Sequence, residues 1–139
     1  MKAIHVITHS VGLGEGIADS LRAQADEIQV YTHRLVCAAR RALTPQAVAK
    51  TSVIVLDVTT PLDETSRHRG SVYTATGFLV AARQQGWPPV LAFCYNSKHL
   101  LHIRDAGMHC AEHLVMPSEA LYPNLCTPKI ADSALTIGR

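Results

Sequence analysis

The segment Ser52–Asp57 (SVIVLD) constrains the fold more than any other part of the chain, because its four central residues are aliphatic and unbroken by polar ones. Branched aliphatic residues favour strands. A run without polar alternation indicates a strand covered on both faces, as in the middle of a parallel sheet with helices above and below. The chain is therefore expected to build an α/β fold around this segment.

Short apolar segments alternate with helical patterns along the rest of the chain. The further strands are expected at Ala3–Thr8, Ile28–Tyr31, Pro89–Cys94 and Glu112–Met116. Helices are expected at Gly16–Ala25, at Leu35–Leu43 with an interruption or restart at Pro45, at Thr74–Gln85 and at Lys98–Ala106. Strands that alternate with helices pair in parallel through right-handed crossovers. The pattern predicts a flavodoxin-like, doubly wound sheet of five parallel strands in the order 2-1-3-4-5, in three layers α/β/α.

The length of 139 residues suits a single domain over residues 1–139. The tail from Ser118 is mostly helical in composition but is interrupted by Pro123 and Pro128. The sheet pattern also predicts a set of buried residues: Ile4, Val6, Val53, Val55, Leu91 and Leu114.

Charge and hydropathy exclude several function classes. A formal net charge of +2 is too small for the basic face that binds phosphate backbones, so nucleic acid is not an expected partner. The longest aliphatic run, Val53–Leu56, is far too short to span a bilayer, and Met1–Ser10 lacks the apolar stretch of a signal peptide. Four cysteines without a C-x-x-C pair suit reduced thiols. We therefore expect a cytoplasmic protein with no membrane partner.

The carboxyl ends of the strands are where ligands gather in such a sheet. Asp57 ends the central strand, and Pro61 follows four residues later in the run VIVLDVTTP. A carboxylate there is placed to accept a phosphoryl group or to bind a cation. It is equally placed to cap the turn that follows the strand. Both interpretations stay open at this point.

Four segments in order, VIVLDVTTP, GFLVAARQQGWPPVLAFC, the AG of RDAG, and HLVMP, resemble the response-regulator receiver domain. The resemblance implies that Asp57 stands at the phosphoacceptor position. It also implies that Cys94 replaces a Thr or Ser, and that Met116 replaces the Lys that precedes Pro117 in receivers. With Thr8, Ser10 and Thr59, these positions form the candidate binding site.

The chain departs from the receiver pattern at the residues that would take part in phosphoryl transfer. Receivers hold Mg²⁺ with two acidic residues at the end of the first strand, whereas this strand ends in Thr8, His9 and Ser10. Without those carboxylates and the Lys, the charge that develops in phosphoryl transfer is poorly compensated. We therefore expect an atypical receiver, or pseudo-receiver, with aspartyl phosphorylation impaired or absent. It would act through protein–protein interaction rather than as an enzyme, without a cofactor.

A second resemblance supports an alternative. The opening IHVITHSVGLGEGIADSL is similar to mannose-type sugar phosphotransferase IIA domains and to the related dihydroxyacetone-kinase subunit. That resemblance implies that His9 carries phosphate and that Asp57 orients its imidazole. The glycine-rich continuation of that family is absent, because TTPLDET follows the strand instead. The alternative is therefore a histidine phosphocarrier.

Two weaker motifs have ordinary explanations beside functional ones. The glycines Gly12, Gly14 and Gly16 would let backbone amides approach an anion, or would simply form a flexible turn between strand and helix. The second motif is a group of histidines, which are either solvent-exposed or ligands of a zinc ion. They are His99, His102, His109 and His113, with Cys110 among them.

Self-association is expected through the fourth helix, the fifth strand and the C-terminal segment, the face that receivers commonly use to dimerise. Leu100, Leu101 and Ile103 put apolar residues on more than one side of a short helix. The same surface is alternatively covered by the C-terminal tail within the monomer. The sequence thus leaves a homodimer as a prediction.

Overall fold

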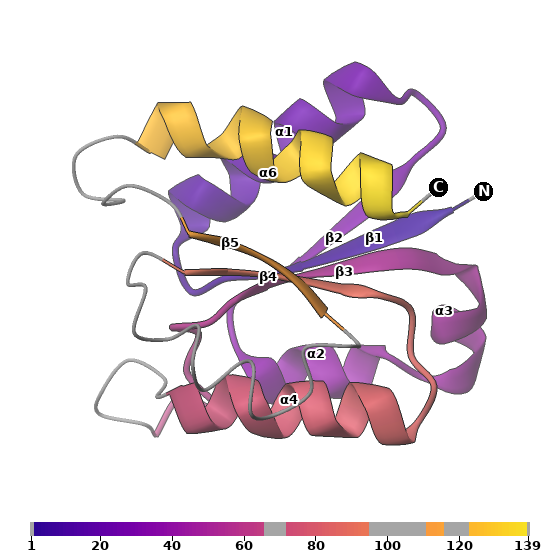
Figure 1. The fold of residues 1–139 in the computed structure, drawn as a ribbon, viewed down its shortest axis with the longest axis vertical. Helices are drawn as coiled ribbons and strands as arrows, with labels where there is room; N and C mark the ends of the chain where they lie inside the picture. Colours follow the sequence, from indigo (N-terminus) through magenta and orange to yellow (C-terminus); the bar gives the residue numbers. More distant parts are fainter. Residues whose placement is uncertain (1, 66–71, 95–110, 116–122, 139) are drawn as a thin grey trace.

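The computed structural model describes residues 2–65, 72–94, 111–115 and 123–138. Its strands form one parallel sheet in the order β2-β1-β3-β4-β5, as Figure 1 shows. They are β1 (Ala3–Ile7), β2 (Gln29–His33), β3 (Thr51–Asp57), β4 (Val90–Cys94) and β5 (Ala111–Val115). The predicted flavodoxin-like fold and strand order are confirmed.

Helices cover both faces of the sheet and give the three expected layers (Figure 1). On one face lie α1 (Val11–Gln24) and α6 (Pro123–Ile137). On the other lie α2 (Val36–Ala42), α3 (Pro45–Lys50) and α4 (Val72–Gln84). Thr44 caps α3 by accepting a hydrogen bond from the amide of Ala47, so Pro45 restarts a helix at its first position.

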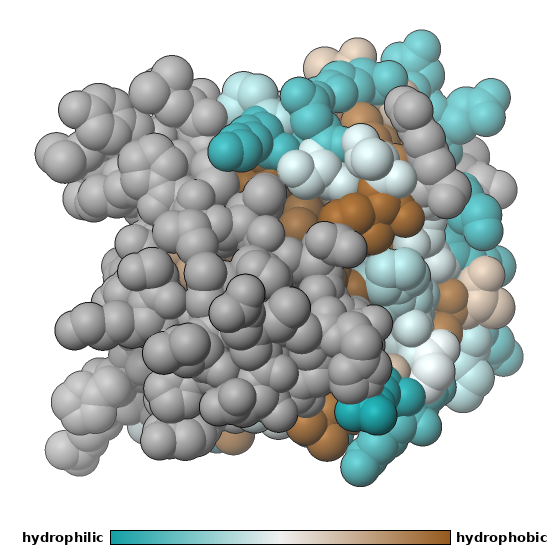
Figure 2. Space-filling view, viewed as in Figure 1, coloured by the Kyte–Doolittle hydropathy of each residue, from teal (hydrophilic) through white to brown (hydrophobic). Residues whose placement is uncertain are grey.

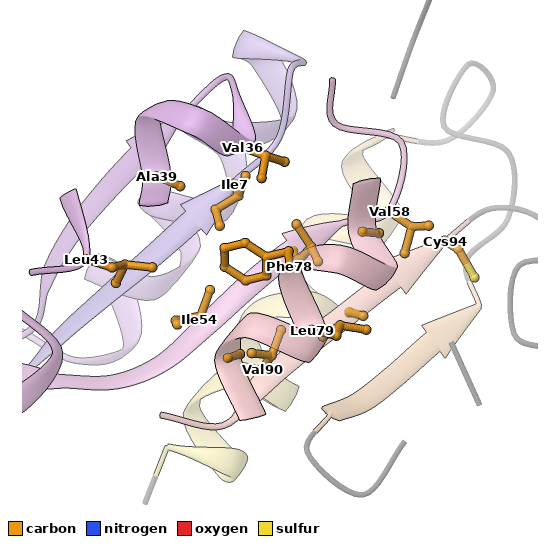
Figure 3. Packing of buried hydrophobic residues seen from close by; sticks show 14 residues of the cluster. Ile7, Val36, Ala39, Leu43, Ile54, Val58, Phe78, Leu79, Val90 and Cys94 are labelled. Carbon is orange, nitrogen blue, oxygen red and sulfur yellow. The ribbon is translucent and has the colours of Figure 1, made fainter. Parts of the chain in front are cut away.

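The central strand β3 has the burial that its sequence predicts. Its alternating side chains reach two separate cores: Ile54 and Leu56 pack under α2 and α4, whereas Val53 and Val55 pack under α1 and α6. Figure 3 shows the first core, in which Phe78 of α4 lies over the sheet. The predicted buried residues Ile4, Val6, Val53, Val55 and Leu91 are all at most 1% exposed. The side chain of Leu114 lies outside the described residues.

Helix α1 begins earlier than the sequence pattern predicts. Ser10 is its N-cap, and the Ser10 hydroxyl accepts a hydrogen bond from the amide of Leu13 at 3.2 Å. All three glycines of the G-x-G-x-G motif therefore lie inside the helix, and the expected flexible turn is wrong. A Cβ at Gly14 would lie 3.2 Å from Cγ2 of Thr8, and one at Gly16 would lie 3.0 Å from Cγ2 of Thr127 in α6. These two glycines allow close packing of α1.

This packing role predicts different effects for the same substitution at two glycines. Gly16→Val is expected to lower the free energy of unfolding by about 1–3 kcal/mol, because the added atoms press on α6. Gly12→Val is the matched control, since nothing lies within 4 Å of a Cβ at that position. It should change stability by no more than about 0.5 kcal/mol, because valine and glycine differ little in helix propensity. Urea unfolding measures both, and equal losses would contradict the packing explanation.

The C-terminal tail is also more regular than predicted. Pro123 begins α6 at a position that needs no amide donor, and Pro128 lies inside the helix without ending it. Proline at such a position removes one backbone hydrogen bond. The helix persists because Ile130, Ala131 and Ala134 are fully buried against the sheet.

The surface of the described part is mostly hydrophilic over the helices, and hydrophobic residues gather near the level of the sheet in Figure 2. Among the described residues, no helix has the length and apolar character needed to cross a membrane. The predicted helix Lys98–Ala106 lies outside the described residues.

Candidate functional site

Asp57 lies at the carboxyl end of β3, where only 3% of the residue is exposed. Thr8 directly follows β1, the neighbouring parallel strand, so the two residues meet at the same edge of the sheet. The Thr8 hydroxyl donates a hydrogen bond of 2.8 Å to Oδ2 of Asp57. Thr8 itself is 2% exposed. Thr8 and Asp57 are thus joined by a direct, buried contact.

The other carboxylate oxygen is occupied by the loop that follows β3. Oδ1 of Asp57 accepts hydrogen bonds from the amide and the hydroxyl of Thr59, at 2.9 and 2.8 Å. This is the geometry of a side chain that caps its own turn. The capping role left open by the sequence is therefore present, and both carboxylate oxygens have donors.

Thr60 is a residue of this site that the sequence analysis missed. Its hydroxyl lies 2.7 Å from the carbonyl oxygen of Asp57 and 3.3 Å from that of Ile7, and the residue is 1% exposed. It thus ties the end of β3 to the end of β1. A strand-ending Asp followed by Val58 and then by two threonines contains residue types that favour turns, and would have indicated this role.

The residues around Asp57 do not fit the magnesium ion that the receiver resemblance implies. Mg²⁺ requires a nearly octahedral set of oxygen ligands and prefers carboxylates. The Asp57 side chain is surrounded by the hydroxyls of Thr8 and Thr59 instead of a second carboxylate. Among the described residues, no group of three or more His, Cys, Asp or Glu side chains is placed to hold a metal ion.

His9 does not form the pair with Asp57 that the phosphocarrier alternative requires. Its ring is exposed, and Nδ1 lies 3.3 Å from the carbonyl oxygen of Arg34. In the described part of the chain, the Asp57 carboxylate is hydrogen bonded to Thr8 and Thr59 alone. The His9 ring thus contacts Arg34, and the predicted His9–Asp57 pair is not among the contacts of the described residues.

The remaining predicted site residues divide into two groups. Ser10 serves as the cap of α1, and Cys94 is fully buried at the end of β4 among the hydrophobic residues under α4. Met116 and Pro117 lie outside the described residues, as do the side chains of the predicted histidine group. The arrangement around Asp57 is therefore built by Thr8, Thr59 and Thr60.

Comparisons with known proteins identify the fold. No protein-family model matches the chain, and no characterised protein matches it in sequence. The chemotaxis response regulator CheY4 of Vibrio cholerae is similar in structure, with a TM-score of 0.65 and 19% identity over 100% of this chain and 99% of that chain. The phosphorylated cyanobacterial phytochrome response regulator RcpA has a TM-score of 0.68 and 17% identity over 97% of this chain and 94% of that one. An orphan response regulator of H. pylori, HP1043, has a TM-score of 0.65 and 11% identity over 99% and 97%.

These structures cover nearly the whole chain, so the resemblance to response-regulator receiver domains is confirmed for the fold. Because their sequence identity to this chain is at most 19%, these structures establish the fold alone. The structures compared are response regulators and give no support to the phosphotransferase alternative.

Proposed function

We propose that the chain is a single receiver-like signalling domain that acts by binding a protein partner, with aspartyl phosphorylation impaired or absent. The observation that carries this proposal is the state of Asp57. Its carboxylate is buried and accepts three hydrogen bonds from Thr8 and Thr59. The chemistry of phosphoryl transfer explains why this state matters.

Phosphorylation of Asp57 would require one carboxylate oxygen to attack phosphorus while the bond to the leaving group breaks. Oδ1 already accepts two hydrogen bonds from Thr59, and Oδ2 accepts one from Thr8, which leaves one lone pair for attack. The negative charge of the transferring group also needs compensation by cations. Thr8 offers a neutral hydroxyl, and the sequence has Met116 where receivers carry Lys. Both features favour a slow or absent reaction.

The same network supports a role as a fixed binding module. The loop after Asp57 contacts the start of α2. The carbonyl oxygens of Pro61 and Leu62 in this loop accept hydrogen bonds from the amides of Val36 and Cys37 at 3.0 and 2.9 Å. These contacts satisfy amides at the start of a helix that have no partner within it. Asp57 therefore holds the loop in one conformation, and the domain would present one constant surface to a partner in a two-component or similar signalling pathway.

Treatment with phosphodonors tests the proposal. We expect no covalent label after incubation with Mg²⁺ and acetyl phosphate, and no change in the amide NMR spectrum after addition of beryllofluoride. Intact mass spectrometry measures the label, with a receiver that phosphorylates normally as the positive control. A stoichiometric, base-labile acyl phosphate on Asp57 would refute the proposal. An acid-labile label on His9 would instead restore the phosphocarrier alternative.

Self-association stays a prediction. Its residues Leu100, Leu101 and Ile103 lie outside the described residues, and a cytoplasmic location is likewise part of the proposal. Sedimentation at micromolar concentration tests the dimer, and a monomeric mass would contradict it.

A further inference from the structure

A pair of histidines joins the edge strand β2 to the sheet. His5 lies in the middle of β1 and is 4% exposed, and His33 is the last residue of β2. Nδ1 of His5 is 2.9 Å from Nε2 of His33, and the two rings lie within 5° of parallel. Tyr31 of β2 lies directly opposite His5, and its ring stacks on the His5 ring with centroids 5.1 Å apart. Tyr31 is 45% exposed and the contact between the histidines is part-buried, so the three rings form a partly buried polar contact between the strands.

The short contact between the two nitrogens fixes the protonation of the pair. One ring must donate its N–H and the other must accept with a lone pair, so the hydrogen bond needs at least one neutral imidazole. A first added proton puts a positive charge into a partly buried contact, and the cost is greatest at His5, which is 4% exposed. A second added proton removes the acceptor and sets two cations against each other. The contact is therefore most favourable when both rings are neutral.

Among the described elements next to His5, no carboxylate is placed to stabilise an imidazolium. The neighbouring strand β3 brings Ile54 opposite His5, and its one titratable side chain is Asp57 at the far end. Helix α2 covers this face and carries Cys37, Arg40 and Arg41, of which both arginines are exposed. Strand β2 contributes Tyr31 and His33. No carboxylate from these described elements faces the pair.

Burial lowers the pKa of both His5 and His33. Desolvation, with a smaller contribution from the charge of His33, lowers the pKa of His5 to about 4. Desolvation also lowers the pKa of His33 below its ordinary value. Both rings are therefore neutral at pH 7. Because an unfolded histidine takes up its proton near pH 6.5, the unfolded chain binds more protons than the folded one between pH 6.5 and about 4. Stability is thus complete above pH 6.5 and falls as the pH is lowered.

The histidine pair is linked to the candidate site through Thr8. The carbonyl oxygen of His33 accepts a hydrogen bond from the amide of Thr8 at 3.0 Å, and the Thr8 hydroxyl binds Asp57. As a strand at the edge of the sheet, β2 pairs with β1 alone. We propose that the His5–His33 pair is a proton-sensitive clasp, which holds β2 and Thr8 in place at neutral pH and releases both on acidification. This inference goes beyond the proposed function, because it adds an input to the domain that does not depend on phosphorylation.

Amide exchange in the full chain tests the clasp. The amides of Gln29 and Thr8 join β1 and β2 through hydrogen bonds to Lys2 and His33, and the amides of Ile54 and Val58 join β3 and β4 through bonds to Pro89 and Phe93. After correction for the intrinsic effect of pH, protection of the first two should fall by about tenfold or more between pH 7 and 5, as each unit of pKa shift corresponds to a tenfold change in equilibrium. Ile54 and Val58 stay paired when β2 alone opens, so at pH 5 their protection should remain well above that of Gln29 and Thr8.

Two variants separate the pair from the other histidines. The double variant His5→Leu with His33→Leu should lose this acid response, because no titrating group remains between β1 and β2. His9→Leu is the matched control, since His9 is exposed and makes no contact with the pair. It should keep the response in full. An acid response that persists in the double variant would overturn the proposal.

Direct NMR titration of the ring protons keeps the inference testable if the double variant does not fold. In the wild-type chain, His5 and His33 should both titrate below the ordinary value of about 6.5. Titration of both His5 and His33 at the ordinary value would equally overturn the clasp.

Discussion

Asp57→Ala is expected to lower the free energy of unfolding by about 3 kcal/mol. The substitution removes the acceptor of three hydrogen bonds, and hydrogen bonds to a charged group contribute more than neutral ones. It also leaves the hydroxyl of Thr8, which is 2% exposed, without its acceptor. Urea or guanidinium unfolding at pH 7 measures the effect.

Asp57→Asn is the matched control for this prediction. The amide keeps the size of the side chain and one acceptor oxygen for Thr59, so a loss of about 1 kcal/mol is expected. Binding to a partner should survive this change, because the proposed signalling does not use phosphorylation. A chain in which Asp57→Ala is as stable as the wild type would contradict the structural role of the carboxylate.

The fold was predictable because its strongest determinants are local. The unbroken aliphatic segment of β3 favours the middle of a parallel sheet, and the third strand lies there in the order 2-1-3-4-5, one of the common doubly wound orders. The start of α1 was not predictable from propensity, since glycine disfavours helices. The Ser10 cap and the close packing of Gly16 on α6 outweigh that preference.

The candidate site was predictable in its position but only partly in its chemistry. Parallel strands bring Thr8 and Asp57 to the same edge, which the sequence order alone implies. The occupation of both Asp57 oxygens depends on side-chain rotamers, which no sequence pattern specifies. The contact between His5 and His33 depends on the register of β1 and β2 across 28 residues.

The same contacts predict what an acidic residue would do at position 8. Thr8→Asp would set a second carboxylate beside Asp57 in a buried site, where the Thr8 hydroxyl now lies 2.8 Å from Oδ2. Two carboxylates in contact raise the pKa of one of them, because both cannot be charged without a large cost. At pH 7 without metal, we expect a stability about 3 kcal/mol below that of Thr8→Asn, the neutral control of equal size.

Two further measurements identify the cause of that loss. A carboxyl pKa raised in the folded state means that the folded chain binds more protons than the unfolded one, so the stability of Thr8→Asp should recover towards that of Thr8→Asn as the pH falls to about 4. Millimolar Mg²⁺ should raise the melting temperature of Thr8→Asp, because two adjacent carboxylates offer the oxygen ligands that one does not. The wild-type chain, with Thr8 hydrogen bonded to Asp57, should not respond to Mg²⁺. Equal stability of the two variants in EDTA at pH 7, or an equal response of the wild type to Mg²⁺, would show that the Asp57 carboxylate is not confined beside residue 8.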